Sequence, residues 1–167
     1  MSLTLYDLTI PVYRRGFAVL ATLLDKGEAH ARDNGGDPEA LVEARLAPDM
    51  LPLAGQIQRA SDTAKAAVAR LTATEAPRFA DEEKSLAELK ARIAATVAYL
   101  DGVLPEAFEG AAERIIRWGR GQPVEQDGRT YLLTFALPNF FFHLTTAYAI
   151  LRHQGVPVGK MDYIGPL

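Results

Sequence analysis

The sequence contains no cysteine, and this absence removes several kinds of chemistry at once. Without thiols the chain forms no disulfide, offers no thiolate nucleophile and supplies no thiolate ligand to a metal ion. A chain without cysteine is also typical of a reducing compartment, so we expect a cytoplasmic location.

Long hydrophobic runs and an excess of basic residues are absent as well. No apolar stretch approaches the roughly 20 residues that cross a bilayer, so we expect no membrane association. The chain has 18 basic and 21 acidic side chains and a net charge of −3, with no long basic block, so we expect no nucleic-acid partner. The sequence also lacks a phosphate-binding loop, a nucleophile elbow and a dinucleotide fingerprint.

What the sequence does contain is apolar residues at helical spacing. With 49% hydrophobic residues among 167, the chain is long enough for a core, and we expect a single domain over residues 1–167. The predicted helices cover Thr4–Ala31, Pro38–Arg45, Leu53–Thr72, a segment from Asp81 or Ser85 to about Leu100, and Pro138 to about Gly155. Residues 109–131 alternate short apolar runs with turn dipeptides, and residues 159–167 form a tail that we expect to pack on the surface. The pattern predicts an all-α fold, a four-helix bundle with a short hairpin or loop insertion before the last helix.

The last predicted helix carries the most informative polar residues. Pro138 is suited to a first helical turn, and Gly155 followed by Pro157 predicts the helix end. Between them Asn139 and His143 are four residues apart, which places both on one face of a helix that is otherwise mostly apolar. This pair is therefore expected to point into the core or into a cleft.

The three histidines of the chain cannot form a common metal site in this arrangement of helices. His30 lies near a polar helix end and is expected to be solvated, and His153 adds favourable charge at a helix C-terminus. His143 is open to two interpretations. It is either a core histidine with a hydrogen-bond partner, or a metal ligand or proton carrier.

Candidate partners for His143 lie on or before the second long helix. Gln56, Gln58 and Asp62 are polar positions on that helix, although a polar run is also what a solvent-facing side requires. Asp49 precedes the helix, and we expect it to cap the helix N-terminus.

Three consecutive phenylalanines occupy most of one turn of the last helix. Phe140, Phe141 and Phe142 point in three directions, so they cannot all face one core. At least one of them is expected to contact a second chain or to line a pocket.

Several of these segments together resemble a known protein family. They are Ala47-Pro48-Asp49-Met50, Gln56-Ile57-Gln58, Leu137-Pro138-Asn139-Phe140-Phe141-Phe142-His143, Thr145-Thr146-Ala147-Tyr148 and Leu151-Arg152-His153-Gln154-Gly155-Val156-Pro157. The chain resembles an uncharacterised bacterial family of unknown function that is similar to the DinB-like superfamily of four-helix bundles. The resemblance implies a DinB-like bundle and a homodimer. It further implies that many relatives hold a divalent metal with three histidines, one on the second helix and two on the last, and that some use the metal to activate a small thiol for transfer.

This chain departs from that three-histidine pattern. Asn139 and His143 match the paired positions on the last helix, and the second helix has glutamine where the resemblance implies a histidine. Neutral amides are weak ligands for zinc or nickel, so either the metal has been lost or a carboxylate such as Asp49 or Asp62 supplements the site.

Two functional hypotheses follow. The first is a bundle protein that binds a small molecule in a cleft near His143 without the full metal site, with Asn139, Gln56 and Gln58 as candidate binding residues. The alternative is a metal-dependent transferase or hydrolase for a small molecule, with zinc, nickel or manganese as the metal and His143 as the candidate catalytic residue.

Overall fold

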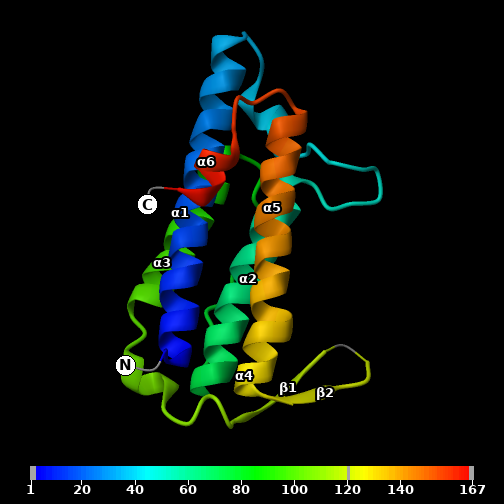
Figure 1. The fold of residues 1–167 in the computed structure, drawn as a ribbon. Helices are drawn as coiled ribbons and strands as arrows, with labels where there is room; N and C mark the ends of the chain where they lie inside the picture. Colours follow the sequence, from blue (N-terminus) through cyan, green and yellow to red (C-terminus); the bar gives the residue numbers. More distant parts are fainter. Residues whose placement is uncertain (1–2, 120, 166–167) are drawn as a thin grey trace.

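A computed structural model describes residues 3–119 and 121–165, and within them four long helices form one bundle (Figure 1). They are α1 (Leu5–Asp33), α2 (Leu53–Thr72), α3 (Leu86–Asp101) and α5 (Leu137–His153). Helix α2 packs against α5 and α3, and α1 packs against α3 and α5. The predicted all-α bundle is confirmed.

Local sequence signals explain where α1 and α3 begin. The side chain of Thr4 accepts a hydrogen bond from the backbone of Asp7, whose carboxylate accepts one in return, and Ser85 and Glu88 form the same capping box at α3. Helix α1 runs through Pro11, which therefore does not mark a helix start.

The segment between α1 and α2 differs from its prediction in two respects. The short helix η1 is a 3-10 helix that covers only Pro38–Leu41. The N-cap of α2 is Pro52, and no side chain caps this end. The expectation that Asp49 caps α2 is therefore wrong. Pro52, with an extended backbone, takes the N-cap position directly before Leu53, and Asp49 lies three residues before Pro52.

The insertion before the last helix is a hairpin, which is one of the two forms that the sequence predicts. After η2 (Pro105–Phe108), strand β1 (Ile115–Trp118) pairs antiparallel with β2 (Val124–Asp127), with Ile116 opposite Gln126. The indole of Trp118 stacks on the ring of Phe135 with 3.8 Å between ring centroids, which fixes the hairpin against the last helix.

The last helix begins earlier than Pro138. Asp127 caps a helical turn, α4 (Gly128–Tyr131), and the chain continues through a π-helical segment, η3 (Leu132–Ala136), directly into α5. Pro138 therefore lies inside a continuous helix rather than at its start. Because proline lacks an N–H and crowds the preceding turn of an α-helix, the wider π-helical turn directly before it is the adjustment that keeps the helix unbroken.

Gly128 is required at the hairpin end of this helix. A Cβ atom there would collide with the carbonyl oxygen of Ala111, so the close approach of the two backbones excludes any side chain.

The C-terminal segment packs on the bundle surface, as predicted. Helix α6 (Lys160–Ile164) lies across α1 (Figure 1). Asp162 forms a 2.5 Å ion pair with Lys26, and Arg15 donates to the carbonyl oxygen of Ile164. Among the described residues, no helix combines the length and apolar character that crossing a membrane requires.

Candidate functional site

The structure pairs His143 of α5 with Gln56 of α2 in the interior of the bundle. The imidazole Nδ1 and the amide Oε1 are 2.8 Å apart, and Gln56 donates from Nε2 to the carbonyl oxygen of Leu51 at 3.0 Å. Because the amide nitrogen of Gln56 is committed to Leu51, its oxygen faces the imidazole and accepts from Nδ1–H. This fixes the tautomer of a neutral His143 and leaves a lone pair on Nε2.

His143 is held in its neutral form. Its side chain is buried, and burial together with the positive charge of Arg59 lowers the pKa of His143 to about 4. The Nε2 atom has no hydrogen-bond partner among the described residues. It is not one of the side-chain atoms that are fully shielded from solvent without a partner, so it reaches solvent. The imidazole is thus an oriented hydrogen-bond acceptor at neutral pH.

Asn139 makes the second contact between the same two helices. Its Nδ2 donates to the hydroxyl of Thr63 at 2.7 Å, and that hydroxyl donates to the carbonyl oxygen of Arg59 at 2.7 Å. Sequence reasoning missed Thr63. Its signal was present, since Gln56 and Thr63 are seven residues apart and therefore share a face of α2, matching the pair on α5. Together Gln56, Thr63, Asn139 and His143 form what we call the α2–α5 seam.

The other predicted partners of His143 are placed elsewhere. Gln58 donates to a carboxylate oxygen of Glu83 at 2.9 Å, on a different side of α2 from Gln56. Asp49 is exposed in the loop before α2. Among residues 3–119 and 121–165, no group of three or more histidine, aspartate or glutamate side chains is placed to hold a metal ion.

Asp62 belongs to a charged cluster between α2, α3 and residues 73–85. The guanidinium of Arg92 contacts the carboxylates of Asp62 at 2.9 Å, Asp81 at 3.0 Å and Glu83 at 2.8 Å. Lys65 lies 3.1 Å from Asp62, and both Lys65 and Arg92 are 4% exposed. We call these five residues the Arg92 cluster.

Two further features tie the Arg92 cluster to its surroundings. Burial opposes ionisation of Glu83, but hydrogen bonds from Arg92 and Gln58 outweigh it and hold the pKa of Glu83 below its usual value. Arg59 forms ion pairs with Asp62 and Asp81, and its charge also acts on His143. Arg59 therefore connects the cluster to the α2–α5 seam.

An apolar hollow lies beside His143 on the flank of α5. It has a volume of about 420 Å³ and is lined by Leu46, Phe141, Phe142, Thr145, Thr146 and Ala149. His143 is adjacent to this lining rather than part of it, and the ring of Phe142 meets the imidazole edge-on with 5.2 Å between centroids. The expectation that some of the three phenylalanines line a pocket is confirmed, whereas Phe140 is fully buried in the core.

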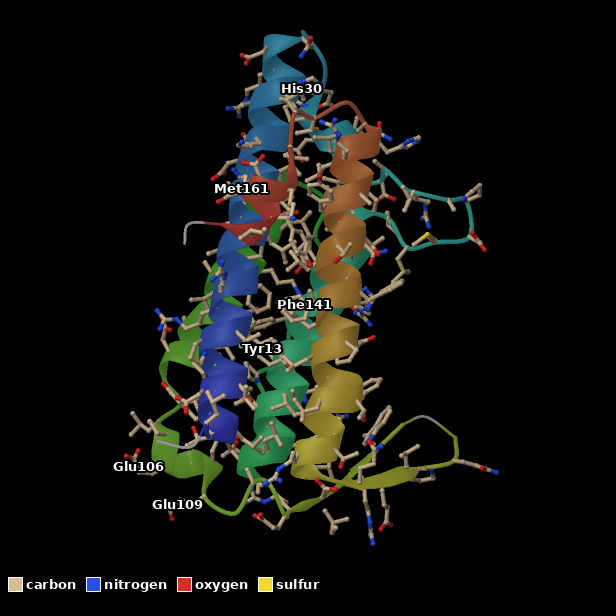
Figure 2. The ribbon with its side chains drawn as sticks, in the orientation of Figure 1. Tyr13, His30, Glu106, Glu109, Phe141 and Met161 are labelled. Carbon is tan, nitrogen blue, oxygen red and sulfur yellow. The ribbon has the colours of Figure 1, made fainter. Side chains whose placement is uncertain are left out.

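The other two histidines lie away from this region. Figure 2 shows His30 near the far end of α1, where its Nδ1 is 3.2 Å from the side-chain nitrogen of Asn34. His30 is half-buried rather than fully solvated, and His153 is exposed in the last turn of α5.

Comparison with known proteins gives a consistent picture. A family described as a domain of unknown function, DUF1993, matches residues 5–164. The chain is also similar to a DinB family member protein from Shewanella denitrificans, whose crystal structure has a TM-score of 0.93 and 44% sequence identity. That match covers 98% of this chain and 93% of the other. No curated protein matches the sequence.

Proposed function

The chain belongs to the DUF1993 family of DinB-like proteins, and from this premise we propose that it binds a small molecule beside His143 without a resident metal ion. One observation carries the proposal. The Nδ1 of His143 is bound to Gln56, while Nε2 keeps an unprotonated lone pair that reaches solvent. An oriented acceptor that solvent reaches is a group that the hydrogen-bond donor of a ligand can bind in place of water.

The surroundings of Nε2 indicate what kind of ligand fits. The ring of Phe142, which meets the imidazole edge-on, also lines the hollow with Leu46, and this carbon surface favours an apolar group. The amide oxygen of Asn139 accepts no hydrogen bond from the described residues, so it adds a second acceptor on the same helix face. The positive charge of Arg59 acts on His143 and would repel a cation. An uncharged hydrogen-bond donor attached to an apolar group is therefore the favoured ligand.

A metal-dependent transferase or hydrolase is the second candidate. An unprotonated imidazole Nε2 is the form that binds zinc or nickel, and this supports the candidate. The remaining donors do not fit a zinc, nickel or manganese site. Gln56 and Asn139 are neutral amides, and the oxygen of Gln56 already accepts from His143. Asp62, the carboxylate considered as a supplement, is bound to three cations. The donor set thus favours the metal-free proposal.

Metal analysis and ligand binding together test the proposal. Purified untagged protein is incubated with zinc, nickel or manganese, and its metal content is measured by plasma mass spectrometry. We expect no stoichiometric metal. A library of small neutral alcohols and amides is screened by ligand-observed NMR, and hits are expected to lose binding in His143→Ala and keep it in the control His153→Ala. Near-stoichiometric metal that disappears in His143→Ala would overturn the proposal in favour of the metal-dependent enzyme.

Two further proposals rest on resemblance and composition. We propose a homodimer, because DinB-like relatives are commonly dimeric, and static light scattering of the purified chain is expected to give twice the mass of one chain. The cytoplasmic location stays a prediction from the absence of cysteine.

A further inference from the structure

A second cavity lies between α1, α5 and α6, away from Gln56 and the imidazole of His143. Its volume is about 230 Å³, and its walls are formed mainly by Val12, Gly16 and Val19 of α1 and by Phe141 and Leu144 of α5. Figure 2 shows Phe141 on the side of α5 that borders α1, with Met161 above it on α6. Gly16 is required here, because a Cβ atom would collide with the ring of Phe140. Gly16 thus borders the cavity without a side chain.

Two polar side chains at the edge of this cavity hold α6 against the bundle. The guanidinium of Arg15 donates to the carbonyl oxygen of Ile164, with the Nε atom at 3.2 Å. The hydroxyl of Tyr163 is 2.8 Å from that of Thr145. An occupant would meet mainly the carbon surface of Val12, Val19, Phe141 and Leu144, which stabilises an apolar molecule.

Helix α6 borders the cavity, and its apolar contact with the bundle includes the ring of Tyr163, which packs edge-on against Tyr148. None of its residues is buried, and the contacts that hold it to the bundle include the Lys26–Asp162 ion pair and the hydrogen bonds of Arg15 and Tyr163. Polar surface contacts of this kind are individually weak. Phe141 is 38% exposed, so the cavity opens to the surface beside α6, which gives a ligand a way in.

We propose that this cavity binds a compact, uncharged, apolar molecule of about one aromatic ring. In another protein an apolar cavity of about 150 Å³ stays dry and binds benzene, so the present volume is sufficient. The size excludes a helix or an extended peptide as occupant. The carbon surface that forms most of the walls favours an uncharged molecule over a carboxylate or an amine. Phe141 borders both this cavity and the hollow near His143, but the cavity includes neither Gln56 nor His143, so the proposal does not rest on the one made for His143.

Benzene and toluene are the probes for the test. In the full chain labelled on valine and leucine methyl groups, titration is expected to shift the methyl signals of Val12, Val19 and Leu144 and to leave those of Val97 unchanged. Val97 lines a different groove, between α1 and α3, and serves as the internal control. Intermolecular NOEs from benzene to Val12 and Leu144 are expected as well. Unchanged signals at all three methyl positions at millimolar probe would overturn the proposal.

A matched pair of variants sharpens this test. Val12→Phe fills the cavity and is expected to weaken benzene binding by about tenfold or more. Val97→Phe adds the same ring to the α1–α3 groove and is expected to leave binding unchanged. Equal binding by the wild type and a folded Val12→Phe would place benzene elsewhere and refute the site. If Val12→Phe does not fold, the NOEs in the wild-type chain decide the question. Imidazole, a polar ring of similar size, is expected not to shift these signals.

Discussion

Two polar clusters lie on different sides of α2. The α2–α5 seam is uncharged, and its two side-chain contacts join Gln56 to His143 and Thr63 to Asn139. The Arg92 cluster is fully charged, and its carboxylates surround Arg92 while Lys65 lies over the ring of Phe79. Both clusters pack against a neighbouring helix. The carboxylates of the Arg92 cluster are bound to cations, whereas Nε2 of His143 in the seam has no partner among the described residues.

The comparison shows two roles for polar groups between helices. Some hold a loop in place, and others keep a free hydrogen-bond acceptor. In the Arg92 cluster, opposite charges approach from α2, α3 and residues 73–85, so the cluster fixes an irregular segment that has no regular structure of its own. In the seam, one neutral amide satisfies one side of an imidazole and nothing among the described residues satisfies the other. Opposite charges thus hold residues 73–85 against the helices, whereas the uncharged seam leaves one imidazole nitrogen without a partner among the described residues.

Removing Arg92 is expected to have the largest effect, because it breaks the charged side of the comparison. Arg92→Ala removes the central cation from three carboxylates and should lower the free energy of unfolding by about 3 kcal/mol, measured by urea denaturation. The loss is at the lower end for a buried pair, because Asp62 and Asp81 are partly exposed and keep Arg59 as a partner. The control is Arg117→Ala, since Arg117 forms an exposed ion pair with Glu125 and its loss should cost about 1 kcal/mol or less. Similar losses in both variants would show that the Arg92 cluster is no stronger than a surface pair.

The pH dependence of stability tests the uncharged side. Because the pKa of His143 is lowered to about 4, the unfolded chain binds one more proton than the folded chain between pH 4 and the usual pKa of 6.5. The free energy of unfolding that depends on the neutral imidazole is fully present above pH 6.5. It falls by about 3 kcal/mol at most as the pH decreases towards 4.

The measurement is the difference in unfolding free energy between wild type and His143→Gln at several pH values. Carboxylates titrate in the same range, and the difference removes their shared contribution. A difference that does not change from pH 7 to pH 4.5 would contradict the assigned burial of a neutral imidazole.

Gln56 gives an intermediate effect. Gln56→Ala leaves the Nδ1–H of His143 without its acceptor in a buried position, and should cost about 1–3 kcal/mol of unfolding free energy. Gln56→Glu places a carboxylate at the same atom and should raise the pKa of His143 above 4, which NMR titration of the imidazole measures. An unchanged pKa in Gln56→Glu would mean that the two side chains do not share this hydrogen bond.

Thr63 gives the smallest expected effect. Thr63→Val keeps the shape of the side chain and removes the hydroxyl that accepts from Asn139, at a cost of about 1 kcal/mol in unfolding free energy. Thr134→Val is the matched control, because Thr134 is exposed and its hydroxyl also donates to a carbonyl oxygen one turn earlier. Equal effects would assign the loss to the backbone contact alone.

Particular residues show how much of the fold could be predicted from the sequence. Helical spacing located the long helices, and the spacing of Asn139 and His143 indicated a shared inward face. The start of the last helix was missed, because Pro138 reads locally as a first-turn residue while Asp127, eleven residues earlier, supplies the actual cap. The residues around Pro138 did not indicate the π-helical turn that allows a proline inside the helix.

The sequence by itself determined the apolar stripes of the long helices and the shared helix face of Asn139 and His143, because each depends on residue type and spacing along one chain. Only the tertiary structure decided which polar residues meet. Gln56 and Gln58 are two positions apart on α2, and this rotation around the helix sends one to His143 and the other to Glu83. The partner of a buried polar group depends on the packing angle and offset of two distant helices, which short-range patterns do not specify.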